Sequence, residues 1–340
     1  MEQMKSKAPQ RTKKPLPSLA ELQNGILKNN LALLSRAITL VESTRPEHQA
    51  VAHKLVEHAL QQKTDTLRIG ITGVPGVGKS TFIEQFGKMI TQRGKKVAVL
   101  TVDPSSSKSK GSILGDKTRM QALVQDPNAY IRPSASGTSL GGVTRKTRES
   151  ITLLEAAGYD VIIVETVGVG QSETAVHDMV DFFLLLKLAG AGDELQGIKR
   201  GIVEMAHAIA INKADGPNKK EAARAQTEFA RALHLFPPKE NGWVPKVVCC
   251  SALENTGLDA LWEMMLAYVK DSKASGYFTD NRSQQNAHWL HQHLEHRLVS
   301  DFYGHKSIKT VLPQYLREVT EGKTSPFAAA EALLQRYREE

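Results

Sequence analysis

The spacing of apolar residues changes character twice along this chain of 340 residues. Between residues 18 and 65 apolar positions recur every three or four residues, which predicts two amphipathic helical stretches separated at Pro46. From Leu67 onward, short apolar and β-branched runs alternate with amphipathic helical stretches. After Lys270 this alternation stops and only helical spacing remains. The pattern therefore predicts an α/β region between two helical ones.

Six of the short runs are apolar on both sides, as expected for strands that are buried on both faces. They are Leu67–Thr72, Val97–Val102, Tyr159–Glu165, Phe182–Leu188, Ala208–Asn212 and Val247–Cys250. Strands of this kind, separated by helices, are typical of a parallel sheet with helices on both faces. We therefore predict an α/β fold with a doubly wound, mostly parallel sheet.

These changes of pattern divide the chain into four expected regions. They are a basic disordered tail (1–17), an N-terminal helical segment (18–65), an α/β domain (66–272) and a C-terminal helical arm (273–340). In the arm, Ser325 as cap and Pro326 in the first turn predict the start of the last helix. Two or three helices make a poor independent core. The arm is therefore expected to pack on the α/β domain, on a second copy in a homodimer, or on both.

Charge and composition narrow the class of partner. The formal net charge is +8, but the residues before Leu19 contribute half of it. The excess therefore lies in the tail and not along one folded face, so a nucleic-acid partner is not indicated. The chain has no apolar run of the roughly 18–20 residues that a membrane span needs, and no membrane partner is expected.

The two cysteines and the tail bear on the expected compartment. Cys249 and Cys250 are adjacent and cannot join distant segments, which favours a reducing compartment. The tail lacks the apolar stretch of a secretory signal, and for a mitochondrial one it is short and poor in helical periodicity. We expect a cytoplasmic protein, or one of the mitochondrial matrix if the source is eukaryotic.

The strongest chemical signal is a phosphate-binding loop. Gly73 to Ser80 fit the pattern G-x-x-x-x-G-K-[ST] in full, between a predicted strand and a predicted helix. The glycines let backbone N–H groups surround a β-phosphate, Lys79 is expected to reach the β- and γ-oxygens, and the Ser80 hydroxyl to bind Mg²⁺. The expected nucleotide contacts of the loop are Gly73, Pro75, Gly76, Val77, Gly78, Lys79, Ser80 and Thr81. This motif makes the predicted fold a P-loop NTPase.

A second motif predicts that the base is guanine. Asn212, Lys213 and Asp215 form an N-K-x-D sequence at the end of a predicted strand. An Asp carboxylate there can accept hydrogen bonds from both N1–H and the 2-amino group of guanine, neither of which adenine presents. The segment Ser251, Ala252 and Leu253 follows the next strand and fits the backbone contact that completes such a site. The expected cofactors are GTP or GDP with Mg²⁺.

Acidic residues at two further strand ends can complete a Mg²⁺ site, because such ends face the ligand crevice of a doubly wound sheet. They are Asp103 and Glu165. A turn or helix cap at Asp103 and a salt bridge at Glu165 remain the alternatives. Gly168 is expected to sense the γ-phosphate through its backbone N–H. No glutamine directly follows Gly168, and Gln171 lies three residues on, so the attacking water must be positioned differently from Ras.

With these residues identified, the chain resembles the methylmalonyl-CoA mutase-associated GTPases, the family of MeaB, ArgK and human MMAA. The resemblance covers about residues 20 to 340. The segments that carry it are 102–106, 111–120, 165–173 and 192–199. It implies a G domain with an N-terminal helical segment and a C-terminal dimerisation arm. It also implies that Asp103, Asp116 and Glu165 serve Mg²⁺ and catalysis, and that residues 190–199 form a partner-contacting switch with Lys199 reaching the active site.

The same resemblance implies a function, and two alternatives stay open. The implied role is a GTPase that guards a cobalamin-dependent acyl-CoA mutase, gates its cofactor loading and protects it against inactivation. A metallochaperone GTPase is one alternative, although the sequence has no Cys/His set at ligand spacing near its two long Gly-rich loops, residues 105–118 and 190–199. A kinase acting on a transport protein is the other. GTP hydrolysis is expected to be slow for the protein alone and faster with its partner, with Lys79, Asp116 and Lys199 as catalytic residues.

Overall fold

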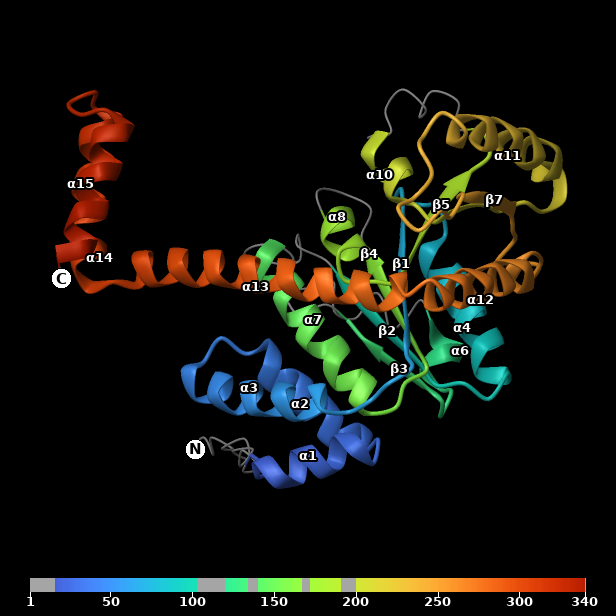
Figure 1. The fold of residues 1–340 in the computed structure, drawn as a ribbon, viewed down its shortest axis with the longest axis horizontal. Coiled ribbons are helices and arrows are strands. Elements are labelled where there is room, and N and C mark those ends of the chain that lie inside the picture. The colour runs from blue at the N-terminus through green and yellow to red at the C-terminus, as the bar shows by residue number, and fades with distance from the viewer. Residues whose placement is uncertain (1–15, 103–119, 134–139, 167–171, 191–199, 340) are drawn as a thin grey trace, which may run out of the picture.

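The computed structural model describes residues 16–102, 120–133, 140–166, 172–190 and 200–339. A seven-stranded sheet lies at its centre (Figure 1). In chain order its strands are β1 Leu67–Gly73, β2 Val97–Val102, β3 Ala129–Arg132, β4 Val161–Thr166, β5 Phe182–Leu188, β6 Ala208–Asn212 and β7 Lys246–Cys249. They lie in the order β3-β2-β4-β1-β5-β6-β7, and every neighbouring pair is parallel. The predicted doubly wound α/β fold is confirmed.

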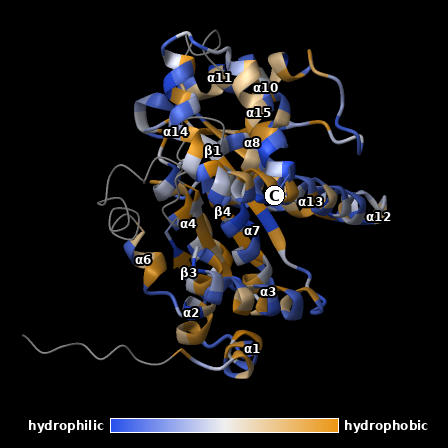
Figure 2. Cartoon of the chain, turned by 90° about the vertical axis from the view of Figure 1, so that its left-hand side faces the viewer, coloured by the Kyte–Doolittle hydropathy of each residue, from blue (hydrophilic) through white to orange (hydrophobic). Residues whose placement is uncertain are grey.

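Helices cover both faces of the sheet. They are α4 Lys79–Gln92, α6 Gln121–Val124, α7 Leu140–Ala156, α8 Ser172–His177, α10 Arg200–Met205, α11 Lys219–Leu233 and α12 Leu258–Ala274. On one face α4, α6 and α12 bury an apolar cluster against the strands, with Phe82, Phe86 and Trp262 at most 3% exposed. On the other face α7 and α8 pack on β1, β2 and β4. Figure 2 shows the apolar strands enclosed between these layers.

The N-terminal segment forms three helices, not the two that its periodicity predicts. They are α1 Leu19–Leu27, α2 Leu31–Glu42 and α3 Pro46–Leu60. Asn29 takes a left-handed conformation with φ +50°, and the Asn30 side chain accepts hydrogen bonds from the N–H groups of Ala32 and Leu33, which starts α2. Helices α1 to α3 pack against α7 and share its apolar cluster. Their stability therefore depends on the α/β core.

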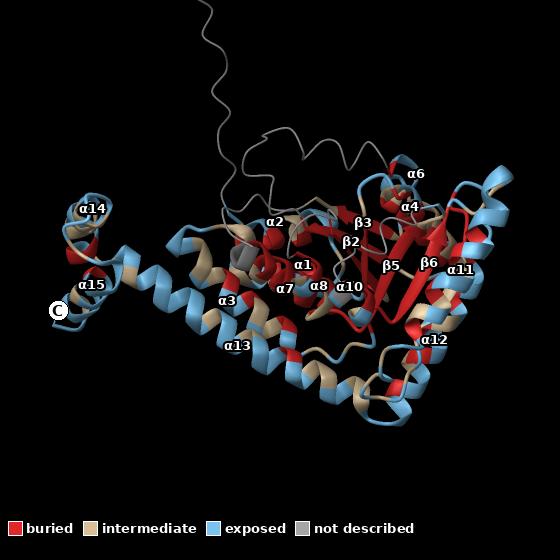
Figure 3. Cartoon of the chain, turned by 90° about the horizontal axis from the view of Figure 1, so that it is seen from above, coloured by how far each residue is buried: buried red, intermediate tan, exposed pale blue. Residues whose placement is uncertain are grey.

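The C-terminal arm consists of α13 Tyr277–Gly304, α14 Lys306–Thr320 and α15 Pro326–Glu339. In α15 the Ser325 hydroxyl accepts a hydrogen bond of 3.1 Å from the Ala328 N–H, which confirms the predicted cap. The structure describes all 28 residues of α13, and Gln285 alone among them is buried. Figure 3 shows α13 leaving the body as a mostly exposed helix with α14 and α15 at its far end.

Buried ion pairs fix the start of this arm. Arg282 binds Asp181 through two hydrogen bonds of 2.7 and 2.8 Å and lies 3.5 Å from Glu155. Glu155 also accepts two hydrogen bonds from the guanidinium of Arg68 on β1. Asp181 is only 2% exposed, so the first turns of α13 are tied to the amino edge of the sheet.

One strand of the sheet, β3, was not predicted from the sequence. Its four residues, which end in Arg132, give too short an apolar run to stand out. In the part of the chain that the structure describes, every helix is too short or too polar to cross a lipid bilayer.

Candidate nucleotide-binding site

The loop predicted to bind phosphate joins β1 directly to α4. β1 ends at Gly73 and α4 begins at Lys79, which is the strand–loop–helix context that the motif requires. Gly76 and Gly78 have φ angles of +83° and +92°, a region that favours glycine. A Cβ atom on Gly78 would lie 3.0 Å from the side-chain nitrogen of Asn212. The loop therefore needs glycine at these positions for its backbone conformation, and at Gly78 also to let Asn212 of the N-K-x-D motif approach closely.

Lys79 lies within the loop that it is expected to serve. Its side chain is buried, and Nζ donates hydrogen bonds to the carbonyl oxygens of Gly73 at 2.7 Å and Val74 at 3.3 Å. Burial lowers the pKa of this ammonium, and the negative charges of Glu165 and Glu173 oppose that shift. The carbonyl groups of Gly73 and Val74 thus hold the Lys79 ammonium at the base of the loop, and phosphate oxygens can take their place as acceptors.

Beside the loop, a hydroxyl and a carboxylate come together. Ser80, in the first turn of α4, donates a hydrogen bond of 3.4 Å from Oγ to Oε1 of Glu165 near the end of β4. Glu165 is 7% exposed. Behind it, the hydroxyl of Thr166 donates to that of Thr72 at 2.8 Å and joins β4 to β1. Hard oxygen ligands of this kind suit Mg²⁺.

The N-K-x-D motif lies against the same loop. The Asn212 side chain donates from Nδ2 to the carbonyl of Val77 at 2.8 Å and accepts at Oδ1 from the Ala252 N–H at 3.4 Å. Lys213 has φ +58°, a backbone conformation that is uncommon for residues other than glycine. Its Nζ donates a hydrogen bond of 2.8 Å to the carbonyl of Gly76. Asn212 and Lys213 therefore tie the phosphate loop to the segment expected to bind the base.

The end of β7 completes this side of the site. The carboxylate of Asp215 accepts a hydrogen bond from the Ser251 hydroxyl. Backbone hydrogen bonds from Cys250 to Ile211 at 2.9 Å, and from Ala214 to Cys250 at 3.0 Å, hold the loops after β6 and β7 side by side. Leu253 is 79% exposed, so its side chain lies on the surface and is not packed in the core.

The structure thus brings together most of the predicted residues at the carboxyl edge of the sheet. Pro75 and Thr81 are exposed on the loop and on α4. Asp103, Asp116, Gly168 and Lys199 lie outside the described residues. Sequence reasoning gave no role to Glu173, which is 4% exposed and whose charge acts on Lys79. Its only signal was its place in the segment 165–173, which carries part of the family resemblance.

The chain is similar to several known proteins. A family model described as "Methylmalonyl Co-A mutase-associated GTPase MeaB" matches residues 34–307. A probable GTPase of Mycobacterium tuberculosis is 48% identical over 92% of this chain and 94% of its own length. The mitochondrial methylmalonic aciduria type A homolog of Mus musculus is 46% identical over 93% and 79%, respectively. The crystal structure of an LAO/AO transport system kinase is similar with a TM-score of 0.73 and 38% identity, covering 94% of this chain and 97% of that one.

Proposed function

The chain belongs to the methylmalonyl-CoA mutase-associated GTPase family, and from this premise we propose that it is a chaperone for a cobalamin-dependent acyl-CoA mutase of the methylmalonyl-CoA mutase type. The protein binds guanine nucleotide and hydrolyses GTP to GDP and phosphate. The proposal rests on the extent of the family match. The match covers residues 34–307, from α2 through the G domain to the first turn of α14. In this role, the nucleotide state gates cofactor loading and protects the mutase from inactivation.

The roles of the nucleotide-binding residues follow from their positions. The N–H groups of the loop from Gly73 to Ser80 surround the β-phosphate, and Lys79 exchanges its carbonyl partners for the β- and γ-oxygens. Asp215 reads N1–H and the 2-amino group of guanine. Ser251 orients that carboxylate, and Asn212 sets the distance between base and phosphate sites through Val77.

The residues present also fit a magnesium ion. Ser80 and Glu165 supply a hydroxyl and a buried carboxylate 3.4 Å apart, and Asp103 and Asp116 are the further candidates. When bound, Mg²⁺ neutralises phosphate charge during GTP hydrolysis. The contribution of the chain is to hold Ser80 at the start of α4 and Glu165 at the end of β4.

Hydrolysis is proposed to be slow for the protein alone. No glutamine directly follows Gly168 to orient the attacking water. A positive side chain directed at the γ-phosphate can raise the rate about 10³–10⁵-fold, and we assign that part to Lys199 in the docked complex. The arm is proposed to join two copies into a homodimer, and the compartment is the cytoplasm, or the mitochondrial matrix in a eukaryote.

Affinity capture tests this proposal against its alternatives. Full-length protein, loaded with a non-hydrolysable GTP analogue or with GDP, is used as bait in an extract of the native host. We expect the bait to capture a cobalamin-dependent mutase, in amounts that differ between the two nucleotide states. Because the similar crystal structure is that of a transport system kinase, transfer of label from γ-³²P-GTP to a captured protein is measured in parallel. Labelled protein without captured mutase would favour the kinase and contradict the chaperone role.

A further inference from the structure

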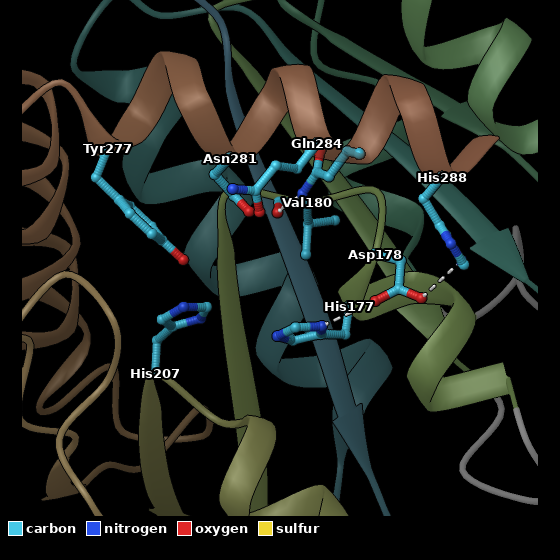
Figure 4. A pocket seen from close by; sticks show the side chains of 9 residues that line it. His177, Asp178, Val180, His207, Tyr277, Asn281, Gln284 and His288 are labelled. Atoms are coloured by element: carbon cyan, nitrogen blue, oxygen red, sulfur yellow. Dashed lines mark hydrogen bonds and ion pairs between the residues drawn. The ribbon is translucent and has the colours of Figure 1, made fainter. Parts of the chain in front are cut away.

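A pocket of about 240 Å³ lies at the edge of the sheet opposite the phosphate loop. Residues at the amino ends of β5 and β6, at the end of α8 and in the first turns of α13 line it (Figure 4). β5 has seven residues, so roughly 20 Å of strand separates this pocket from the carboxyl edge of the sheet, where the nucleotide-binding site lies. We call that edge the nucleotide edge. The pocket is therefore distinct from the nucleotide-binding site.

His207 supplies the central observation. Its side chain is more than nine-tenths buried, and Nδ1 accepts a hydrogen bond of 2.9 Å from the backbone N–H of Phe183, so Nδ1 carries no proton. Burial lowers the pKa of this imidazole well below its ordinary value, and the charge of Lys239 adds to the effect. The neutral ring must therefore carry its proton on Nε2. Within the described part of the chain, that N–H has no hydrogen-bond partner.

Further donors face His207 from α13. Tyr277, Asn281 and Gln284 recur at four- and three-residue steps and so lie on one face of the helix. Figure 4 shows the Tyr277 hydroxyl directed towards His207, and the amide side chains of Asn281 and Gln284 extending towards the pocket. Among the described residues, none forms a side-chain hydrogen bond with these three groups. They can all donate to a ligand.

The carboxylate that lines the pocket is already engaged. Asp178 binds Nδ1 of His177 at 3.1 Å and lies 3.6 Å from Nε2 of His288 (Figure 4). In the described parts of the chain, no group of three His, Cys, Asp or Glu side chains is arranged to hold a metal ion. The pocket thus offers several donors, and its one carboxylate already has two imidazole partners. A ligand rich in acceptors suits it better than a cation.

We propose that this pocket binds a small carboxylate, whose oxygens accept hydrogen bonds from Nε2–H of His207 and from the hydroxyl of Tyr277. A carboxylate is acceptor-only and so complements this donor set. The volume lies below the roughly 300–1,000 Å³ of drug-sized sites, which limits the ligand to about ten non-hydrogen atoms. The parallel rings of His177 and His207 give the pocket flat walls, which favour a planar molecule. The ligand would contact both the sheet and α13.

Benzoate is a suitable probe, because it joins a carboxylate to a flat ring. Full-length protein with GDP bound is titrated with benzoate and with its neutral isostere benzamide, by calorimetry or ligand-observed NMR. We expect saturable benzoate binding with a dissociation constant of about 1 mM or tighter, and benzamide binding at least about tenfold weaker. Absence of saturable benzoate binding, or equal affinity for the two probes, would overturn the proposal.

Two variants place the probe in this pocket. Tyr277→Phe removes one hydroxyl, and His207→Asn keeps an acceptor for the Phe183 N–H but lacks the Nε2 donor. Each is expected to weaken benzoate binding about tenfold, the size of one hydrogen bond to a charged group. GTP hydrolysis should stay at the wild-type rate, because the pocket lies at the other edge of the sheet. Unchanged benzoate affinity in both folded variants, or displacement of benzoate by excess GDP, would contradict the assignment.

Discussion

The nucleotide edge of the sheet and the C-terminal arm differ in how their side chains find partners. At the edge, Asn212 and Lys213 reach back to carbonyl groups of the phosphate loop, and Ser80 bonds to Glu165. In the arm, apolar side chains such as Leu290 and Leu298 are 58% and 64% exposed. The edge is therefore specified by contacts within one chain, whereas the arm exposes apolar side chains that the proposed homodimer would cover. Predictions for the two regions differ accordingly.

The largest effect is expected at Lys79. Replacing it with alanine removes charge-assisted contacts to two phosphate groups, each worth about 1.5–3 kcal/mol, so GDP should bind at least about a hundredfold more weakly. The fold should persist, because the variant loses only two hydrogen bonds from Nζ, to the carbonyls of Gly73 and Val74. Calorimetry with GDP measures the affinity, and circular dichroism checks the fold. A folded variant that binds GDP like the wild type would refute the role of Lys79.

A second large effect is expected where the arm meets the sheet. Arg282→Met leaves Asp181 buried without its cationic partner and should lower the free energy of unfolding by about 3–5 kcal/mol. Arg297→Met is the matched control on the same helix, because the Arg297–Asp301 pair is exposed and worth about 0.3–0.5 kcal/mol. Urea denaturation followed by circular dichroism measures both. Similar losses in the two variants would show that α13 is not fixed through Arg282.

Base specificity offers a smaller but more selective test of the nucleotide edge. Asp215→Asn should weaken GTP binding and improve xanthosine triphosphate binding, because an amide donates where xanthine presents a carbonyl. We expect a change in the ratio of the two affinities of roughly a hundredfold, the size of two lost hydrogen bonds. Competition of both nucleotides against a fluorescent GDP analogue measures that ratio. A variant that keeps the wild-type preference for GTP would mean that the guanine site lies elsewhere.

The smallest effect is expected in the arm itself. The full-length protein should be a dimer at micromolar concentration, and Leu298→Asp should weaken dimerisation roughly tenfold or more by placing a charge in the interface. Leu235→Asp, at an 83% exposed position next to α11, serves as the control and should leave the dimer intact. Light scattering over a dilution series gives the dissociation constants. A wild-type monomer, or equal dimers in both variants, would exclude this use of the arm.

Sequence reasoning placed the buried strands more accurately than the exposed helices. The predicted bounds of β2, β5 and β6 match those of the structure, because strands buried on both faces leave continuous apolar runs. The break between α1 and α2 was missed, since it rests on the backbone of Asn29 and not on a change of periodicity. The bounds of α13 could not be predicted, because a helix of 28 residues with one buried residue carries little apolar pattern.

The candidate site shows the same limit. The phosphate loop and the N-K-x-D motif could be predicted because their chemistry needs fixed residue types at fixed spacing. The contact of Asn212 with Val77, and the charge of Glu173 near Lys79, depend on how distant segments approach one another. The pocket beneath α13 had no sequence signal at all, since its donors come from α13 and from the starts of strands. The assignments of Asp103, Asp116, Gly168 and Lys199 stay predictions.

We propose that a mutase partner completes the catalytic site of this GTPase. The most direct test of this proposal is the steady-state rate of GTP hydrolysis with and without a cobalamin-dependent mutase, for wild type and for Lys199→Ala. We expect the mutase to raise kcat of the wild type and the Lys199→Ala variant to lose most of that increase, with its basal rate and GTP affinity nearly unchanged. Equal stimulation of both proteins would exclude Lys199 from the mechanism. No stimulation of either protein would contradict the mutase as partner.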